Sequence, residues 1–133
     1  MIYLDDLLQA TGGELQGQAK ATDFSGFAFD SRQLEPGELF LAVKTATGDG
    51  HNFIEDAIQH GATGVLCEYC QVLSDSGQGV TTIVVADIQQ ALTDYAAYLL
   101  QTYKPRVVGV TGSSGIRYLY TLGFNALEFT IFY

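Results

Sequence analysis

The amino-acid sequence predicts an α/β fold, because short apolar runs of strand length alternate with amphipathic helical segments. The composition indicates a folded domain with a hydrophobic core, since 47% of the 133 residues are hydrophobic and only 16% are charged. A chain of this length holds one ordinary domain, or one domain and a fragment of another.

The first and third predicted helices have clear end signals. The first covers Leu4–Ala10, and the pair Gly12-Gly13 follows it as a stop. The third begins after Asp87, which can cap the helix with Gln90 at its N3 position. Its apolar residues follow the helical period and predict one buried face: Ile88, Ala91, Leu92, Tyr95, Ala96 and Leu99.

The second helix is predicted to follow Asn52. Asn52 and Glu55 have the N-cap and N3 spacing of a capping box. His60 and Gly61 supply a C-terminal signal, with the glycine expected in the left-handed position after the last turn.

Five short apolar runs are predicted as strands. The last four are continuous rather than alternating, which is typical of strands buried on both faces of a sheet. The runs are Phe27-Ala28-Phe29, Leu39–Val43, Gly64–Leu66, Thr82–Val85 and Val107–Val110.

The C-terminal part predicts a change of domain. Pro105 should end the third helix and hold Lys104 in an extended conformation. We therefore expect a first domain over residues 1–103, and a linker, first strand and partial P-loop over 104–115. Residues 116–133 form a divergent hydrophobic tail, which is too short and too charged to favour a membrane span.

The charge of the chain limits its partners. Fifteen acidic and six basic residues give a net charge of −9, which disfavours nucleic acids and anionic membranes. A phosphorylated small molecule is still compatible, because backbone N–H groups and a few local cations can bind it. The N-terminus has no secretory signal and the chain has two cysteines, so we expect a cytoplasmic protein.

The segment Phe29-Asp30-Ser31-Arg32 is the first candidate site. Here a strand runs into a polar turn, and the hydroxyl of Ser31 and the guanidinium of Arg32 suit a carbonyl-rich ligand or an anion. The alternative is a charged turn in which Asp30 and Arg32 satisfy the neighbouring backbone.

The segment Thr45–His51 is the second candidate, a loop of small residues between a buried strand and a helix. Its glycines would let a ligand approach the backbone, and the helix N-terminus could offer free N–H groups to a phosphate. The alternative is an ordinary connection in which Asp49-Gly50 forms a turn.

The segment Val108–Gly115 begins as a P-loop does, with a buried strand that opens into a glycine-rich turn. Ile116 and Arg117 follow where a P-loop has its Lys and Ser/Thr. The phosphate-binding ammonium and the magnesium-binding hydroxyl are therefore both missing from this loop.

Five stretches in the right order carry a resemblance: Asp30–Arg32, Pro36–Ala42, Gly48–Phe53, His60–Ala62 and Val107–Gly115. Together they resemble the Mur ligase family, the ATP-dependent amino-acid-adding enzymes of peptidoglycan synthesis. The resemblance covers about residues 1–115. It implies a mixed sheet flanked by helices, followed by the start of a truncated P-loop domain.

The resemblance also implies roles for individual residues. This N-terminal domain would hold the UDP portion of UDP-MurNAc-peptide, with Phe29 and Ser31 facing the uridine and Ala46, Thr47 and Gly48 lining the nucleotide. Candidates at the same rim are Arg32, Asp49 and His51, and the ATP loop would begin with Gly112, Ser113, Ser114 and Gly115.

The resemblance is strongest to the member that adds D-alanyl-D-alanine to UDP-MurNAc-tripeptide, and the member that adds the third amino acid is the alternative. ATP and magnesium serve the intact family, but neither is expected to bind well here. The chain alone is expected to bind substrate rather than to catalyse. Two other classes stay open: a nucleotidase with a degenerate P-loop, and a non-catalytic fragment that self-associates through residues 116–133.

Cys67 and Cys70 have the Cys-x-x-Cys spacing of redox and zinc sites. Only two histidines could complete a zinc site, and no helix signal follows Cys70. We interpret Cys67 as a small apolar residue at a strand end, and we predict no metal site and no catalytic residue.

Overall fold

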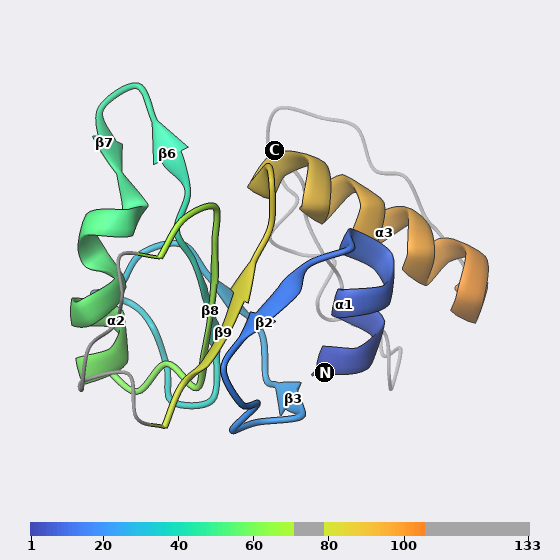
Figure 1. The fold of residues 1–133 in the computed structure, drawn as a ribbon, viewed down its shortest axis with the longest axis horizontal. Coiled ribbons are helices and arrows are strands. Elements are labelled where there is room, and N and C mark those ends of the chain that lie inside the picture. Colours follow the sequence, from blue (N-terminus) through green and yellow to red (C-terminus); the bar gives the residue numbers. More distant parts are fainter. Residues whose placement is uncertain (71–78, 106–133) are drawn as a thin grey trace, which may run out of the picture.

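The computed structural model describes residues 1–70 and 79–105, which form three layers: α2 on one side, a sheet in the middle, and α1 and α3 on the other side (Figure 1). The elements are β1 (Ile2–Tyr3), α1 (Leu4–Thr11), β2 (Glu14–Gln16), β3 (Asp23–Phe24), β4 (Phe27–Ala28), β5 (Leu39–Leu41), β6 (Lys44–Thr45), β7 (Gly48–Asp49), the 3-10 helix η1 (Gly50–Phe53), α2 (Ile54–Gln59), β8 (Gly64–Cys67), β9 (Thr81–Val84) and α3 (Ile88–Tyr103).

The central sheet has five strands in the order β2-β9-β8-β5-β4. The strands β9, β8, β5 and β4 run parallel to one another, and β2 pairs antiparallel with β9 at the edge of the sheet. This mixed sheet flanked by helices confirms the expected α/β fold. Parallel strands need cover on both faces, and the helices supply it here.

The middle strands are buried, as their continuous apolar runs predict. All residues of β5 and β8 are buried, and Thr81, Thr82 and Ile83 of β9 are buried as well. Gly64 at the start of β8 makes room for the ring of Phe24, because a Cβ there would overlap that ring. The same Cβ would also stand 2.7 Å from the side chain of Leu39. The core therefore depends on the absence of a side chain at this position.

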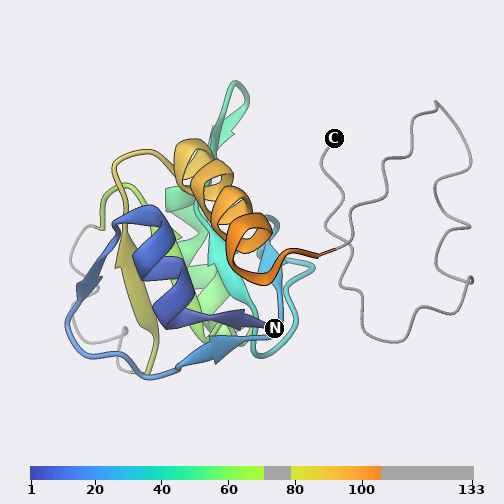
Figure 2. The ribbon, with the colours of Figure 1, turned by 90° about the vertical axis from the view of Figure 1, so that its right-hand side faces the viewer.

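Helices α1 and α3 lie side by side on one face of the sheet (Figure 1, Figure 2). The hydroxyl of Tyr103 donates to Asp6 Oδ2 at 2.6 Å and that of Tyr98 to Asp6 Oδ1 at 3.1 Å. Tyr95 of α3 reaches the sheet, where its ring packs edge-on against Phe27 of β4 with centroids 6.0 Å apart.

Two of the predicted helix ends are confirmed. Gly12 follows α1 in the left-handed conformation with φ 65°, and its N–H donates to the carbonyl of Leu8. At the start of α3, Asp87 Oδ1 accepts from the N–H of Gln90 at 2.8 Å. Both signals involve only residues within a few positions of the helix end, so they do not depend on what the helix packs against.

The capping box predicted at Asn52 and Glu55 is wrong. The turn η1 runs directly into α2, whose N-cap is Phe53 and whose first turn receives no side-chain cap. Asp49 caps η1 instead, with its side chain accepting from the N–H of His51. Asn52 already lies within the 3-10 turn, and an N-cap residue needs a non-helical backbone.

The prediction for Lys104 is also wrong. It ends α3 with φ 45° and ψ 52°, in the left-handed rather than the extended region. This conformation ends the helix and still keeps the residue before Pro105 out of the right-handed region.

Five short strands lie in segments where the sequence predicted none: β1, β2, β3, β6 and β7. The predicted strand Val107–Val110, the glycine loop Gly112–Gly115 and the tail 116–133 lie outside the described residues. Within residues 1–70 and 79–105, none of the helices is long and apolar enough to cross a membrane.

Candidate functional site

The candidate site lies at one edge of the sheet. Because β4, β5, β8 and β9 are parallel, the segments that follow them all emerge at the same edge. Phe29–Arg32 follows β4, Ala42–His51 follows β5, Glu68–Cys70 follows β8 and Val85–Asp87 follows β9. The carboxyl edge of a parallel sheet is where α/β proteins place their ligands.

A two-stranded hairpin, β6–β7, projects from this edge beyond the neighbouring helices and strands (Figure 1, Figure 2). Lys44 pairs with Asp49 and Thr45 with Gly48, so Ala46 and Thr47 form the exposed turn. The Thr45 hydroxyl donates to the carbonyl of Gly48 at 3.1 Å and closes the turn. The turn at Asp49-Gly50, which is the alternative interpretation of this segment, does not form, since Asp49 ends β7 and Gly50 begins η1.

Three of the predicted nucleotide-binding residues therefore lie at the hairpin tip. Ala46, Thr47 and Gly48 are exposed, and a Cβ on Gly48 would meet no atom within 4 Å. The backbone of the tip is thus accessible from solvent.

Asp49 and His51 at the base of the hairpin contact each other. His51 Nδ1 lies 2.7 Å from Asp49 Oδ1, which also accepts from the N–H of His51 at 3.0 Å. His51 Nε2 accepts from the backbone N–H of Glu68 at 3.0 Å. An accepting Nε2 requires the proton on Nδ1, so Nδ1 donates to the carboxylate of Asp49. The family resemblance places His51 at the rim of the site, but its side chain is only 4% exposed.

Tyr69 and Glu68 complete this network, and no local pattern in the sequence indicates a role for either. The Tyr69 ring stacks on His51 with centroids 4.0 Å apart and planes 7° apart, while its hydroxyl donates to Asp49 Oδ2. Glu68 Oε2 accepts from the N–H of Ile88 at the start of α3, at 3.1 Å. The Tyr69 hydroxyl and the His51 donors hold the pKa of the Asp49 carboxyl well below its usual range.

The turn after β4 presents different groups. Phe29 is 64% exposed, whereas Ser31 is buried at 4% exposure. Arg32 donates from Nε and Nη2 to the two carboxylate oxygens of Asp30, at 3.0 and 2.9 Å. This bidentate pair lowers the pKa of Asp30 and raises that of Arg32. The contact between Asp30 and Arg32 agrees with the alternative of a charged turn in which these two residues satisfy local hydrogen bonds. The side chain of Arg32 is nevertheless 81% exposed and stays accessible to an anion.

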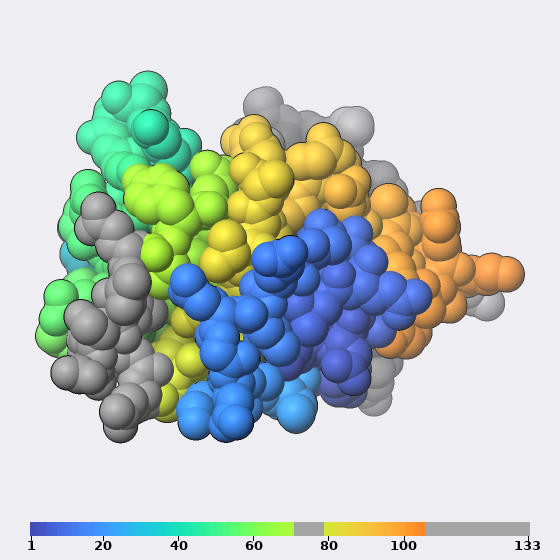
Figure 3. Space-filling model, in the orientation of Figure 1, coloured from blue at the N-terminus to red at the C-terminus, as the bar shows by residue number. Residues whose placement is uncertain are grey.

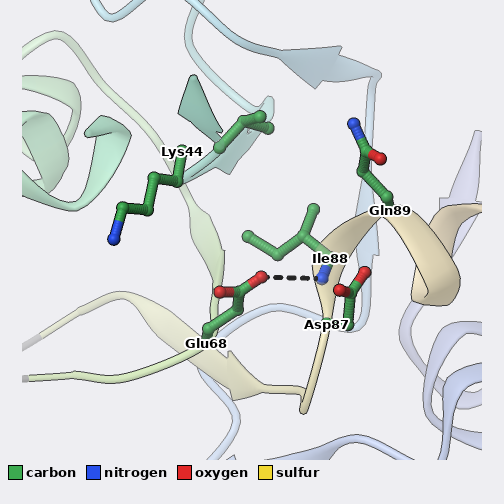
Figure 4. A pocket seen from close by; sticks show the side chains of 6 residues that line it. Lys44, Glu68, Asp87, Ile88 and Gln89 are labelled. Carbon is green, nitrogen blue, oxygen red and sulfur yellow. Dashed lines mark hydrogen bonds between the residues drawn. The ribbon is translucent and has the colours of Figure 1, made fainter. Parts of the chain in front are cut away.

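A hollow of about 280 Å³ opens at the same edge between the base of the hairpin and the start of α3 (Figure 3, Figure 4). Figure 4 shows the Glu68 carboxylate directed at the Ile88 nitrogen, while the side chain of Lys44 extends away from Ile88 and Gln89. Lys44 is a second cation at this edge that the sequence analysis did not select. The lining residues are Val43, Lys44, Glu68, Asp87, Ile88 and Gln89.

Neither cysteine forms a disulfide, and Cys67 is fully buried at the end of β8. Burial, followed by the neighbouring Cys70, raises the pKa of the Cys67 thiol to about 12. Among residues 1–70 and 79–105, no group of three or more His, Cys, Asp or Glu side chains could hold a metal ion.

Comparison with known families identifies the chain. The model of the Mur ligase family, catalytic domain, matches residues 23–102. The chain belongs to the Mur ligase family.

Among curated Mur ligases, the chain is 41% identical over 117 residues to the UDP-N-acetylmuramoyl-L-alanyl-D-glutamate--2,6-diaminopimelate ligase of Cytophaga hutchinsonii. This match covers 86% of this chain and 23% of that protein. It is 33% identical over 125 residues to the UDP-N-acetylmuramoyl-tripeptide--D-alanyl-D-alanine ligase of Treponema pallidum, with 86% of this chain and 27% of that protein covered.

Solved structures of Mur ligases share the fold. A crystal structure of MurF from Acinetobacter baumannii superposes with a TM-score of 0.67 at 29% identity, covering 77% of this chain and 22% of that one. The chain thus spans about a quarter of the length of these relatives.

Proposed function

We propose that this chain is the part of a peptidoglycan-synthesising Mur ligase that binds the UDP-MurNAc portion of a UDP-MurNAc-peptide in the cytoplasm. The observation that carries the proposal is the convergence of two segments that the family resemblance assigns to the nucleotide. Phe29–Arg32 and the hairpin tip Ala46–Gly48 emerge from neighbouring parallel strands at one edge of the sheet.

The chemistry of this edge suits such a ligand. Phe29 offers an exposed ring to a planar base, and the hairpin tip offers open backbone. Arg32 and Lys44 are two of the six basic residues of a chain with net charge −9. Their presence at this edge supports a ligand with phosphate groups.

The identity of the intact ligase has two candidates. The motifs favour the member that adds D-alanyl-D-alanine, whereas the curated relatives at 38–41% identity are diaminopimelate ligases. Both substrates share UDP-MurNAc, and the proposed site contacts that shared part. We therefore expect UDP-MurNAc-dipeptide and UDP-MurNAc-tripeptide to bind this chain with similar affinity.

The test is a titration of the full chain, followed by its amide resonances. UDP-MurNAc-dipeptide, UDP-MurNAc-tripeptide and UDP-N-acetylglucosamine are each added, with ATP and magnesium as the control. Selective shifts at Ser31 and at residues 45–48, absent with ATP, are expected. No shifts at millimolar UDP-MurNAc-peptide, or shifts confined to other surfaces, would contradict the proposal.

ATP and magnesium would serve the intact ligase at its P-loop. The residues that match the start of that loop, Gly112–Gly115, lie outside the described residues. Ile116 stands where the loop has its lysine, so we propose that this chain alone neither binds ATP tightly nor catalyses the ligation. ATP hydrolysis by the purified chain would favour the nucleotidase alternative instead.

A further inference from the structure

We infer that Asp49 and His51 are positioning residues rather than ligand contacts, and that Tyr69 completes a clamp with them that holds the hairpin β6–β7 in its binding position. This inference rests on the proposed function, because the hairpin tip is the segment proposed to contact the nucleotide. The clamp is defined as the side chains of Asp49, His51 and Tyr69.

The polar atoms of Asp49 and His51 are already engaged within the protein. Asp49 Oδ1 accepts from His51 and Asp49 Oδ2 accepts from the Tyr69 hydroxyl. Both ring nitrogens of His51 are engaged as well, Nδ1 with Asp49 and Nε2 with the N–H of Glu68. A ligand that hydrogen-bonded to a ring nitrogen of His51 would displace one of these hydrogen bonds, and Asp49 Oδ1 already accepts two.

The clamp joins segments that are distant in the sequence. Asp49 ends β7, His51 lies in η1, and Tyr69 follows β8 on the neighbouring part of the sheet. The stacked rings and the Tyr69–Asp49 bond therefore tie the free-standing hairpin to the end of a buried central strand. Without such a tie, a two-stranded hairpin is marginally stable.

The clamp also reaches the start of α3. Glu68 uses its N–H for His51 Nε2 and its carboxylate for the N–H of Ile88. A single residue thus connects the base of the hairpin with the helix end that lines the hollow (Figure 4). The three segments around the hollow are held as one unit, which reduces the conformational entropy that a ligand must remove on binding.

The test compares Tyr69→Phe with Tyr98→Phe in the full chain. Tyr69→Phe keeps the ring that stacks on His51 but removes the donor to Asp49. Tyr98→Phe is the matched control, because it removes a hydroxyl that donates to another carboxylate, Asp6, on the α1–α3 face. Melting temperatures of both variants establish that they are folded.

Two readouts separate the clamp from the proposed function. Amide hydrogen exchange, measured without ligand, is expected to accelerate at Glu68 and Gly50 in Tyr69→Phe, and to stay unchanged there in Tyr98→Phe. Affinity for UDP-MurNAc-tripeptide is expected to fall about three- to ten-fold in Tyr69→Phe only, the effect of one net hydrogen bond.

Each outcome has a distinct meaning. If exchange in Tyr69→Phe matches the wild type, the clamp is overturned whether or not the ligand binds. If exchange accelerates but affinity is unchanged, the positioning role is overturned. If the wild-type chain binds no UDP-MurNAc-tripeptide, the proposed function fails, and with it the role of the clamp in binding.

Discussion

The backbone N–H of Gly50 donates to the carbonyl oxygen of Val43 at 2.8 Å and closes the base of the hairpin β6–β7. The two residues approach so closely that a Cβ on Gly50 would stand 2.7 Å from the Val43 nitrogen. The atoms in the way belong to the backbone, which cannot rotate aside as a side chain can. This position therefore requires glycine because of space, since its φ is not among the positive ones.

Replacing Gly50 should consequently open the hairpin base. We expect Gly50→Ala to lower the free energy of unfolding by about 1–3 kcal/mol, as overpacking usually does. Urea unfolding measures the change. Gly48→Ala is the matched control, because a Cβ there meets no atom within 4 Å. Equal effects of the two substitutions would contradict the steric explanation.

Gly64→Ala is expected to be more destabilising still, because its Cβ would overlap the ring of Phe24 in the core. The added methyl group should cost at least about 2 kcal/mol of the free energy of unfolding. A double substitution, Gly64→Ala with Phe24→Leu, should recover part of that loss by removing the ring. Additive losses in a double-mutant cycle would argue against the contact as the cause.

Asp87 caps α3 beside the hollow, so its removal tests a cap that also shapes the candidate site. We expect Asp87→Ala to cost about 1 kcal/mol of the free energy of unfolding, the usual value of an N-cap. Asp94→Ala is the control, because Asp94 accepts from the side chain of Gln90 rather than from its backbone. A loss at Asp94 as large as that at Asp87 would show that the effect is not one of capping.

The raised pKa of Cys67, about 12, predicts a native thiol that resists ionisation. Unfolding would return this pKa to its ordinary value of 9.0. Between pH 9.0 and about 12 the native state therefore keeps a thiol proton that the unfolded state loses. The contribution to stability is full below pH 9 and is lost as pH rises toward 12.

Thiol titration with an aromatic disulfide checks this prediction. At pH 8 the native chain should react at Cys70, which is half-buried, and react at Cys67 only after unfolding. The variant Cys70→Ser should then show no rapid reaction. Two equally fast thiols in the native chain would contradict the burial of Cys67.

Arg32 offers a test of the proposed ligand. We expect Arg32→Ala to weaken the binding of UDP-MurNAc-tripeptide, and Asp30→Ala to leave it unchanged or strengthen it, because Asp30 competes for the guanidinium. The loss should diminish at high salt, where the attraction between guanidinium and phosphate is screened. Melting temperatures should change little, because exposed ion pairs contribute little to stability. Equal weakening by both substitutions would indicate a role for the turn as a whole.

The sequence by itself determined the features that depend on neighbouring residues. The cap at Asp87, the stop at Gly12 and the buried strands β5 and β8 arise from spacing and apolar runs within a few residues. The two segments proposed to bind the nucleotide were also selected from local motifs, Phe29–Arg32 and Thr45–His51.

Only the tertiary structure decided how distant residues pair. Leu15 of β2 pairs with Ile83 of β9, and Tyr69 contacts Asp49, although no local pattern relates these residues. The hairpin turn at Ala46-Thr47 lacks the Asn-Gly or Asp-Gly pair that marks such turns, so the sequence predicts only a loop there. The family resemblance places His51 at the rim of the site, but the structure buries its side chain. Its burial depends on Glu68 and Tyr69, whose contact with it arises only when β5 and β8 align in parallel.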